Sequence, residues 1–474
     1  MANAKMTFLS SSEIEMIHGQ SLKALKEIGI KVHSVPVLKL LEAKGAEVDM
    51  GTYVARLPEK MVADALSSAP KTFKLCARDP QHDLVMPAHP YPYATTSGLA
   101  VFVTDYETGE YRPSTRRDIA AFAKLGDALT PDFLWTALTA NDVPKMAHGP
   151  HEIWETLKNS QKHVQGVTVQ SARDAQVQIK LAALVAGGHD ALRERPLMSV
   201  ISCPLAPLSF ETGAIEAQVE FAKAGIPICS MSMSLGGLSA PVTVAGMILN
   251  ANAENLASLV ITQAASPGAP HIYTSESAPM DMLTGSINYG APEKSLISYG
   301  LGQMSRRYNL PCLVADTGFG EDIKGGLEDV QFIANQFIGL AAYTDIITGM
   351  GCVDDAKGIS LEQLVIDSYM WDFFKDFLKE VEISEEMMGL EAIRAVGHGG
   401  DFLSSEHTLK YLRSDLTQWD RTKLALLALD DDHMAQEANR VVRKVLAEHQ
   451  VPSLDDTLLQ AGNEIIKAYE KEVS

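Results

Sequence analysis

Eight short apolar segments, separated by amphipathic stretches, constrain the fold of this chain more than any other feature. Several of them are nearly continuous apolar runs, which is typical of strands that are buried on both faces of a parallel sheet. They recur about every 30 to 45 residues, the length of one strand–helix unit. The segments are Thr95 to Val103, Phe133 to Leu138, His163 to Val169, Met198 to Cys203, Ile226 to Met231, His271 to Ser275, Cys312 to Ala315 and Asp345 to Thr348.

Eight repeats of a strand followed by a helix predict a closed α/β barrel, the (β/α)8 or TIM barrel, over residues 90–380. We expect residues 1–89 to form an N-terminal helical segment with short strands. Residues 381–474 are expected to form a C-terminal helical extension packed on the barrel. The competing architecture is an open, doubly wound sheet. That fold favours fewer strands and a glycine-rich phosphate loop after the first one, and no G-x-G-x-x-G occurs there.

The charge balance limits the classes of partner. The formal net charge is -20 and no block rich in Lys or Arg occurs, so nucleic-acid binding is not expected. An acidic protein suits a cationic small substrate, although the acidity can equally serve solubility alone. Five cysteines without a C-x-x-C pair indicate a reducing compartment. No apolar signal core and no run of about 18 apolar residues occurs, so we expect a cytoplasmic protein that spans no membrane.

In an α/β barrel, function is carried by the loops that follow the carboxyl ends of the strands. These windows contain no H-E-x-x-H, G-x-S-x-G or P-loop motif. His148 and His151 lie beside a Gly-Pro turn without a matching cysteine, so we predict no metal site. Cys203 and Cys312 lie in or beside apolar strands and are interpreted as buried, unreactive thiols.

The same windows are rich in methionine, aromatic, glycine and hydroxyl residues and poor in Lys and Arg. Such a pocket suits a cation whose charge is spread over methyl groups and held by the faces of aromatic rings. Ordinary core packing is the alternative for each of these side chains taken alone.

A set of motifs, in a fixed order along the chain, resembles the trimethylamine:corrinoid methyltransferase family. None of the motifs is a catalytic signature, but their joint order extends over about 400 residues. They are Leu75 to Pro80, Thr108 to Pro113, Leu192 to Pro196, Ala240 to Gly246, Met280 to Gly285, Leu361 to Asp367, and Gly399 to Leu403 followed by His407-Thr408.

The resemblance implies methyl transfer from a methylated amine to the Co(I) corrinoid of a separate protein. Founding members of the family hold a pyrrolysine near the end of the seventh strand, where this chain has only standard residues, Asp316 to Gly320. The chain therefore looks like the branch without pyrrolysine, whose members demethylate quaternary amines, glycine betaine first among them. The implied product is dimethylglycine. No tightly bound cofactor is expected, because a cognate corrinoid protein supplies cob(I)alamin, and self-association into a homo-oligomer is expected.

For a betaine, we predict a cage of aromatic rings around the ammonium group and polar partners for the carboxylate. The cage is drawn from Tyr93, Trp135, Tyr273, Phe319 and Phe402. The carboxylate partners are drawn from His407, Thr317 and the backbone N–H groups around Gly318 and Gly320. Glu276 and Asp316, at the ends of the sixth and seventh strands, are the predicted catalytic acids. For Glu276, pairing with a neighbouring cation or exposure to solvent is the alternative.

Three alternatives remain open. The same reaction could act on proline betaine, carnitine, choline or another methylated amine. A protein of this shape could also bind or sense betaine without catalysis. An unrelated barrel lyase or aldolase would need a lysine at a strand end to form a Schiff base, and Lys324 is the nearest candidate.

Overall fold

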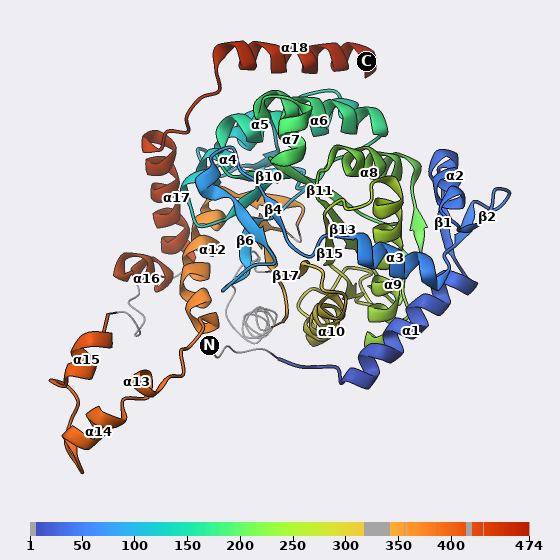
Figure 1. Cartoon of the computed structure of the whole chain (residues 1–474). Coiled ribbons are helices and arrows are strands. Elements are labelled where there is room, and N and C mark those ends of the chain that lie inside the picture. Colours follow the sequence, from blue (N-terminus) through green and yellow to red (C-terminus); the bar gives the residue numbers. More distant parts are fainter. Residues whose placement is uncertain (1–5, 317–341, 355, 414–419, 430, 474) are drawn as a thin grey trace.

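Eight parallel strands close into a barrel at the centre of the molecule (Figure 1). The computed structural model describes residues 6–316, 342–354, 356–413, 420–429 and 431–473. Around the barrel the strand order is β10-β11-β13-β15-β17-β18-β6-β9. The strands are β6 (Tyr93–Thr96), β9 (Phe133–Trp135), β10 (His163–Gly166), β11 (Met198–Ser202), β13 (Ile228–Ser232), β15 (His271–Ser275), β17 (Cys312–Asp316) and β18 (Ile346–Met350). Each strand overlaps one of the eight predicted segments, so the (β/α)8 barrel is confirmed.

The first predicted segment contains two strands rather than one. β6 ends at Thr96, and residues 102–104 belong to β7 (Phe102–Thr104). β7 pairs with β8 (Tyr111–Pro113) and β20 (Gly358–Ser360), and β20 pairs with β19 (Cys352–Val353). These strands form a small sheet above the carboxyl ends of β6 and β18. The two strands are separated by Ser97-Gly98, a turn signal that the single predicted segment passed over.

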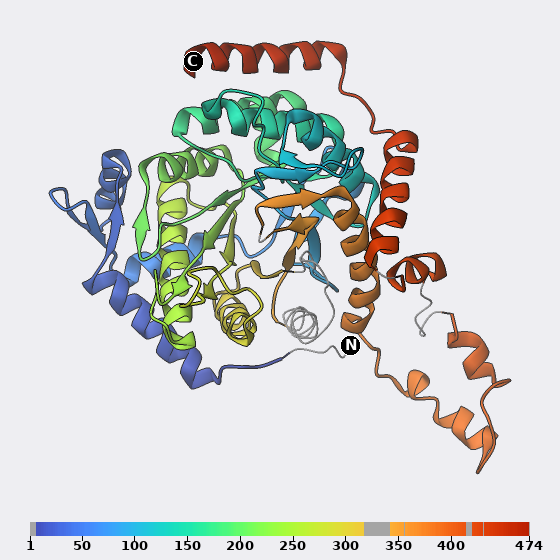
Figure 2. The same cartoon turned by 180° about the vertical axis from the view of Figure 1, so that it is seen from behind.

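A ring of helices covers the outside of the barrel (Figures 1 and 2). The ring contains α4 (Arg116–Ala128), α5 (His148–Asn159), α6 (Ala172–Ala186), α7 (His189–Glu194), α8 (Thr212–Ala224), α9 (Val244–Ala265), α10 (Pro292–Tyr308) and α12 (Leu361–Phe374). Among the described helices, α9 alone is long and apolar enough to cross a membrane. However, 78% of its apolar window is buried inside the protein. That burial is typical of a core helix, because α9 lies between the barrel and the N-terminal helices.

The N-terminal residues form a layer outside α9 and also close one end of the barrel. The layer contains α1 (Ser11–Glu27), β1 (Ile30–Val32), α2 (Val35–Ala43), β2 (Glu47–Asp49), β3 (Val54–Arg56) and α3 (Glu59–Ser68). A capping box between Ser10 and Glu13 starts α1. β1 lies between β3 and β12 (Ser209–Phe210), so the N-terminal sheet is tied to the loop after β11. The hairpin of β4 (Phe73–Leu75) and β5 (Leu84–Met86) follows, with the short helix η1 (Pro80–His82) in its turn.

The C-terminal residues pack on the barrel in two places. α17 (Asp431–Glu448) contacts α12 and α4, with α16 (Arg421–Leu427) beside it. α18 (Asp456–Val473) lies across α6, α5 and the short helix η2 (Lys145–Ala147). α12 is followed directly by the 3-10 turn η3 (Lys375–Leu378).

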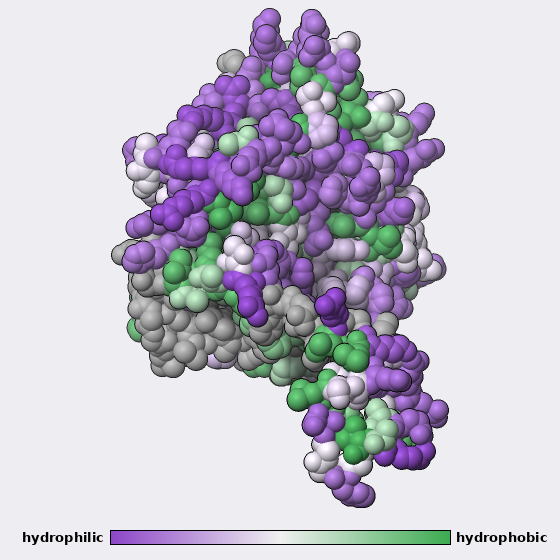
Figure 3. All heavy atoms as spheres, turned by 90° about the vertical axis from the view of Figure 1, so that its left-hand side faces the viewer, coloured by the Kyte–Doolittle hydropathy of each residue, from purple (hydrophilic) through white to green (hydrophobic). Residues whose placement is uncertain are grey.

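Between η3 and α16 the chain leaves the body of the molecule as an arm, residues 382–413 (Figures 1 and 2). Its helices are short: α13 (Glu385–Met388), α14 (Leu390–Val396) and α15 (Glu406–Tyr411). Hydrophobic side chains lie exposed on it, as Figure 3 shows. They include Ile383, Met388, Leu390, Ile393, Leu403 and Leu409.

Candidate active site at the barrel mouth

The amino-terminal end of the barrel is closed by the β4–β5 hairpin. Leu75, Leu84 and Met86 pack in one apolar cluster with Phe133 and Ile346 of the barrel strands. The backbone N–H of Cys76 donates to the carbonyl oxygen of Pro196, just before β11, and this bond helps to hold the hairpin at this end. A substrate therefore has to enter at the carboxyl ends of the strands, which we call the mouth and where α/β barrels carry their active sites.

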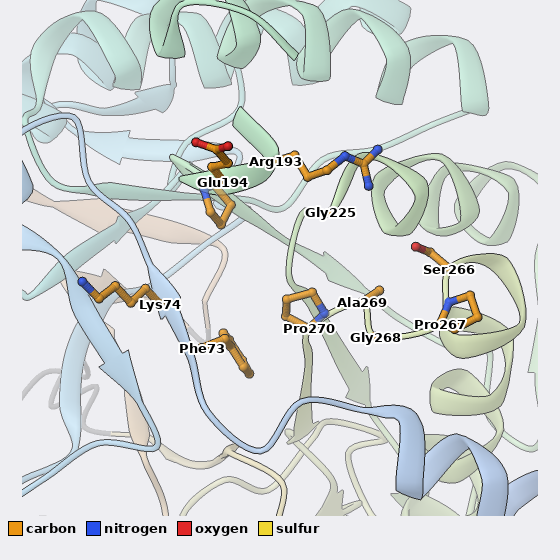
Figure 4. Close-up of a pocket in the computed structure, with 11 residues that line it drawn as sticks. Phe73, Lys74, Arg193, Glu194, Gly225, Ser266, Pro267, Gly268, Ala269 and Pro270 are labelled. Carbon is orange, nitrogen blue, oxygen red and sulfur yellow. The ribbon is translucent and has the colours of Figure 1, made fainter. Parts of the chain in front are cut away.

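A cavity of about 360 Å³ lies on the closed side (Figure 4). It is lined by Phe73, Lys74, Arg193, Glu194, Pro196, Gly225, Ser266, Pro267, Gly268, Ala269 and Pro270. Pro196 and Pro270 precede β11 and β15, so the cavity faces the amino-terminal ends of the strands. Because that face carries stability rather than chemistry in this fold, we do not place the active site there.

The upper interior of the barrel contains polar atoms that lack partners. Trp135 ends β9 and is 6% exposed, and its indole N–H has no hydrogen-bond partner within the described residues. Its ring packs against Gly98, where a Cβ would lie 2.4 Å from Cε3, so only glycine fits beside it. Gln165, its register partner on β10, donates to Ser199 Oγ and Cys229 Sγ. The side-chain oxygen of Gln165, Oε1, is also without a partner in the described part of the chain. A polar group of a bound molecule could satisfy either atom.

An ion pair of buried side chains lies at the end of the sixth strand. Glu276 follows β15, and Lys294 lies in the first turn of α10. Lys294 Nζ donates to Glu276 Oε2 at 3.0 Å. The side chain of Lys294 is 7% exposed and that of Glu276 is 11% exposed. The centroid of the Tyr289 ring lies 5.9 Å from Lys294 Nζ. The pairing of Glu276 with a neighbouring cation, which the sequence left open, is therefore present in the structure.

Other buried carboxyl groups surround the mouth. Glu254 on α9 accepts hydrogen bonds from Ser232 Oγ and Asn250 Nδ2, and burial raises its pKa. Glu152 on α5 accepts one from the N–H of Ala140 at 3.3 Å, and burial raises its pKa to about 8. Glu152 is therefore mostly neutral near pH 7 and adds little negative charge to the mouth.

The predicted site residues are not all brought together. Trp135 and Glu276 lie at the mouth. Asp316 is the last residue of β17, and Thr317, Gly318, Phe319 and Gly320 lie outside the described residues. Tyr93 begins β6 at the opposite, closed end, where its hydroxyl donates to the carbonyl oxygen of Val85 in the hairpin.

Two further predicted positions point away from the interior. The side chain of Tyr273 faces the helix layer, where its hydroxyl donates to Asn252 Oδ1 at 3.0 Å on α9. Phe402, which is 41% exposed, and His407 lie on the arm. His407 contacts Tyr411 and Gly389 there, with ring centroids of His407 and Tyr411 4.8 Å apart. In this single chain, the arm does not bring these residues to the mouth (Figure 1).

Two residues were missed by reasoning from the sequence. Lys294 lies 18 residues after Glu276 along the chain. The usable signal was its place in the first turn of a helix that starts with Pro292, because that turn lies beside the strand ends. Gln165 could have been found from the alternation along β10, which turns His163 and Gln165 inward.

The two strand-end cysteines differ in their exposure. Cys312 is buried, whereas Cys203 is exposed in the loop after β11, so the prediction of a buried thiol was wrong for Cys203. The reason is that β11 ends at Ser202, one residue earlier than the apolar run. Within the described residues, no group of three or more His, Cys, Asp or Glu side chains could hold a metal ion.

An apolar rim surrounds part of the mouth. We use this name for exposed hydrophobic side chains in the loops that follow β6, β11, β13 and β15: Leu99, Leu205, Leu238, Val242, Met282 and Leu283. Leu283 is 97% exposed. Clusters of exposed apolar side chains of this kind mark surfaces that contact other macromolecules.

Comparisons with known proteins give a consistent result. Residues 2–474 match the family model described as trimethylamine methyltransferase. A trimethylamine methyltransferase of Desulfitobacterium hafniense is 31% identical over 93% of this chain and 88% of its own length. A glycine betaine methyltransferase of another strain of that species is 29% identical over 96% of both chains. The crystal structure of the Methanosarcina barkeri monomethylamine methyltransferase superposes with a TM-score of 0.55 at 12% identity, covering 94% of this chain and 89% of that one. At 12% identity, the similarity to the monomethylamine methyltransferase shows a shared fold and nothing more.

Proposed function

Because the chain belongs to the trimethylamine methyltransferase family, we propose that it transfers a methyl group from glycine betaine to the Co(I) corrinoid of a separate protein. The observation that carries the proposal is the family match over residues 2–474. A match of that length includes all eight strand ends, and these build the active site of an α/β barrel.

The chemistry of the donor supports a quaternary amine. In the proposed reaction the N–CH3 bond breaks, its electron pair stays on nitrogen, and the Co(I) partner supplies the pair for the new Co–C bond. A quaternary nitrogen is already cationic, so dimethylglycine leaves as a neutral amine. A tertiary amine is a poor donor until it gains a positive charge. The chain has only standard residues from Asp316 to Gly320, where the founding members of the family hold pyrrolysine, and one relative is named a glycine betaine methyltransferase.

The proposed role of the protein is to position the two reactants and exclude water. The hairpin closes one end of the barrel, so the corrinoid protein would approach the mouth. The apolar rim supplies a surface suited to such a partner. Glu276 and Asp316, at the ends of β15 and β17, remain the proposed acidic residues beside the substrate.

A screen of methyl donors tests the proposal. The purified chain is mixed with a Co(I) corrinoid protein and, separately, with glycine betaine, proline betaine, carnitine, choline or trimethylamine, while the absorbance of the corrinoid is followed. We expect methyl–cobalt formation with glycine betaine. Transfer from another quaternary amine, but not from glycine betaine, would support the proposed reaction and contradict the proposed substrate. Betaine binding in calorimetry without transfer from any amine would favour the sensing alternative.

Phe319 is the aromatic residue of the proposed cage that lies nearest the end of the seventh strand, although it is outside the described residues. Phe319→Ala should weaken betaine binding by about 1 to 2 kcal/mol, because one cation–π wall is removed. Calorimetry measures the change. Tyr53→Ala, in the exposed turn between β2 and β3 and outside the proposed cage, is the comparison variant and should leave the affinity unchanged. Equal affinities of wild type and Phe319→Ala would remove Phe319 from the site.

Chelation tests whether a dissociable metal takes part. A quaternary amine needs no Lewis acid to improve its leaving group. We therefore expect the rate of methyl transfer to be unchanged after incubation with a chelator and gel filtration. Loss of transfer that added zinc restores would contradict this prediction.

We also propose a cytoplasmic location and self-association. The five cysteines without a C-x-x-C pair support a reducing compartment. The hydrophobic side chains exposed on the arm favour a further contact between chains. Light scattering coupled to size-exclusion chromatography measures the assembly, and a mass of one chain at micromolar concentration would exclude it.

A further inference from the structure

Two polar atoms without partners lie on neighbouring strands at the barrel mouth. Trp135 ends β9 and Gln165 lies on β10, and the two residues are register partners in adjacent parallel strands, so their side chains share a face of the sheet. Within the described residues, neither the indole N–H of Trp135 nor Oε1 of Gln165 has a hydrogen-bond partner. An unpaired buried polar group is costly. Two of them on adjacent strands indicate a place where a bound molecule completes the hydrogen bonding.

A chain of hydrogen bonds in the barrel interior fixes which way the Gln165 amide faces. The carbonyl oxygen of Cys76 can only accept, so His163 Nδ1 carries the hydrogen of this 2.8 Å bond. His163 is neutral, because burial lowers its pKa to about 4, and its Nε2 accepts the hydrogen of Ser199 Oγ at 2.9 Å. Ser199 then has no hydrogen left to donate, so Gln165 must turn its NH2 group toward Ser199 Oγ, at 3.0 Å. The side-chain oxygen of Gln165 is therefore directed away from this chain.

Close packing fixes the position of the Trp135 ring. A Cβ on Gly98 would lie 2.4 Å from Cε3 and 3.2 Å from Cζ3, so this edge of the indole packs directly on the loop after β6. Nε1 belongs to the five-membered ring at the other edge of the indole. The N–H of Trp135 therefore points away from Gly98 and has a fixed direction.

We propose that these two atoms hold the two ends of a betaine: Trp135 Nε1–H donates to the substrate carboxylate, and Gln165 Oε1 faces the methylated ammonium group. The assignment rests on the proposed function, since it takes the mouth as the substrate site. Neighbouring strands lie about 4.8 Å apart, and one CH2 group separates the nitrogen of betaine from its carboxylate. One molecule of that size reaches both atoms.

The two protein atoms suit the chemistry of a betaine. A quaternary nitrogen has no N–H to donate, so it meets an acceptor through methyl C–H groups that carry part of its positive charge. A desolvated carboxylate needs a donor, and the windows after the strands are poor in Lys and Arg. The indole N–H of Trp135 supplies that donor. Neutral partners are sufficient for a zwitterion, because the ligand brings no net charge into the barrel.

Two single variants and three ligands test the subsite by calorimetry, without a corrinoid partner. Glycine betaine carries both charges, tetramethylammonium only the cation, and 3,3-dimethylbutanoate keeps the carboxylate with carbon in place of nitrogen. Trp135→Phe keeps a ring and removes the N–H, so it should weaken betaine and 3,3-dimethylbutanoate at least about 10-fold and leave tetramethylammonium unchanged. Gln165→Met removes the oxygen, so it should weaken betaine and tetramethylammonium about 5-fold and leave 3,3-dimethylbutanoate unchanged. Competition against betaine measures the weaker ligands.

The crossed pattern separates the subsite from a structural role. A folding defect, or a buried water that joins the two atoms without contacting a substrate, would change the three affinities together or not at all. Either result contradicts the proposal. Gln165→Glu keeps an oxygen and adds a negative charge, so it should bind tetramethylammonium at least as tightly as the wild type does. Loss of that binding in Gln165→Glu would also contradict the proposal.

Two matched controls carry the same kinds of substitution away from the mouth. Trp154→Phe removes an indole N–H that donates to Asn463 on α18, and Gln176→Met removes an amide that donates to Glu220 on α8. Neither control should change the affinity for any of the three ligands.

The outcomes also distinguish this proposal from the proposed function. If the two variants give the crossed pattern but no methyl group reaches the corrinoid, the subsite stands and the function fails. If methyl transfer from betaine occurs and Gln165→Met and Trp135→Phe bind betaine as the wild type does, the function stands and the subsite fails.

Discussion

Replacing Trp154 with alanine should lower the free energy of unfolding by about 3 to 5 kcal/mol. Trp154 on α5 is 1% exposed and is one of the largest fully buried side chains. Its ring packs against Gly462 of α18, where a Cβ would lie 2.2 Å from Cζ2. Its indole N–H donates to Asn463 Oδ1 at 2.9 Å. The substitution leaves a cavity and removes a buried contact that helps to hold the C-terminal helix on the barrel.

Chemical denaturation measures the loss, and limited proteolysis shows whether α18 is released. Asn463→Ala is the control, because it removes the hydrogen bond but keeps the ring, and should cost about 1 kcal/mol. Gly462→Leu should resemble Trp154→Ala, since the new side chain collides with the ring from the other side. A cost below about 1 kcal/mol for Trp154→Ala would mean that α18 does not depend on this contact.

The second large effect is a loss of stability at acid pH. His163 is fully buried in the barrel interior, with Nδ1 bonded to the carbonyl oxygen of Cys76 at 2.8 Å and Nε2 to Ser199 Oγ at 2.9 Å. Burial lowers its pKa to about 4. In the unfolded chain the imidazole takes up a proton near pH 6.5. The unfolded state therefore binds the extra proton as the pH falls from 6.5 to 4, and His163 costs stability throughout that window, about 3 kcal/mol in all.

A variant isolates this contribution, because other buried groups titrate in the same range. His163→Asn keeps an N–H that can donate to Cys76 but has no titrating ring. The stability difference between wild type and variant, measured by denaturation from pH 7 to pH 4, should shrink by about 1.4 kcal/mol per pH unit below 6.5. A difference that stays constant with pH would show that His163 becomes protonated inside the folded protein.

The architecture could be predicted from the sequence because buried parallel strands leave a strong local signal. His271 to Ser275 forms β15 with the predicted bounds. The first segment was less successful, because the Ser97-Gly98 turn between β6 and β7 was included in one strand. The arm could not be foreseen, since the sequence of its short helices does not show that, among the described residues, they make few contacts with the body of the molecule.

The candidate site was harder to predict because it depends on direction as well as position. Tyr273 and Glu276 are three residues apart on one strand and its loop, and only the second faces the interior. Successive side chains of a strand point to opposite faces, so the alternation places these two residues on different faces. In a short strand the sequence does not show which of the two faces is directed to the barrel interior. Tyr93 lies in the predicted strand but at its amino-terminal end. Lys294 comes from the following helix, so its contact with Glu276 is set by the tertiary fold.

The central claim is methyl transfer from glycine betaine, and a single-turnover experiment with betaine labelled by deuterium in its methyl groups tests it most directly. The chain, a Co(I) corrinoid protein and labelled betaine are mixed, and mass spectrometry follows both products. We predict one labelled methyl group on cobalt for each dimethylglycine released. Labelled betaine that remains intact, while the same preparation transfers a methyl group from trimethylamine, would contradict the claim.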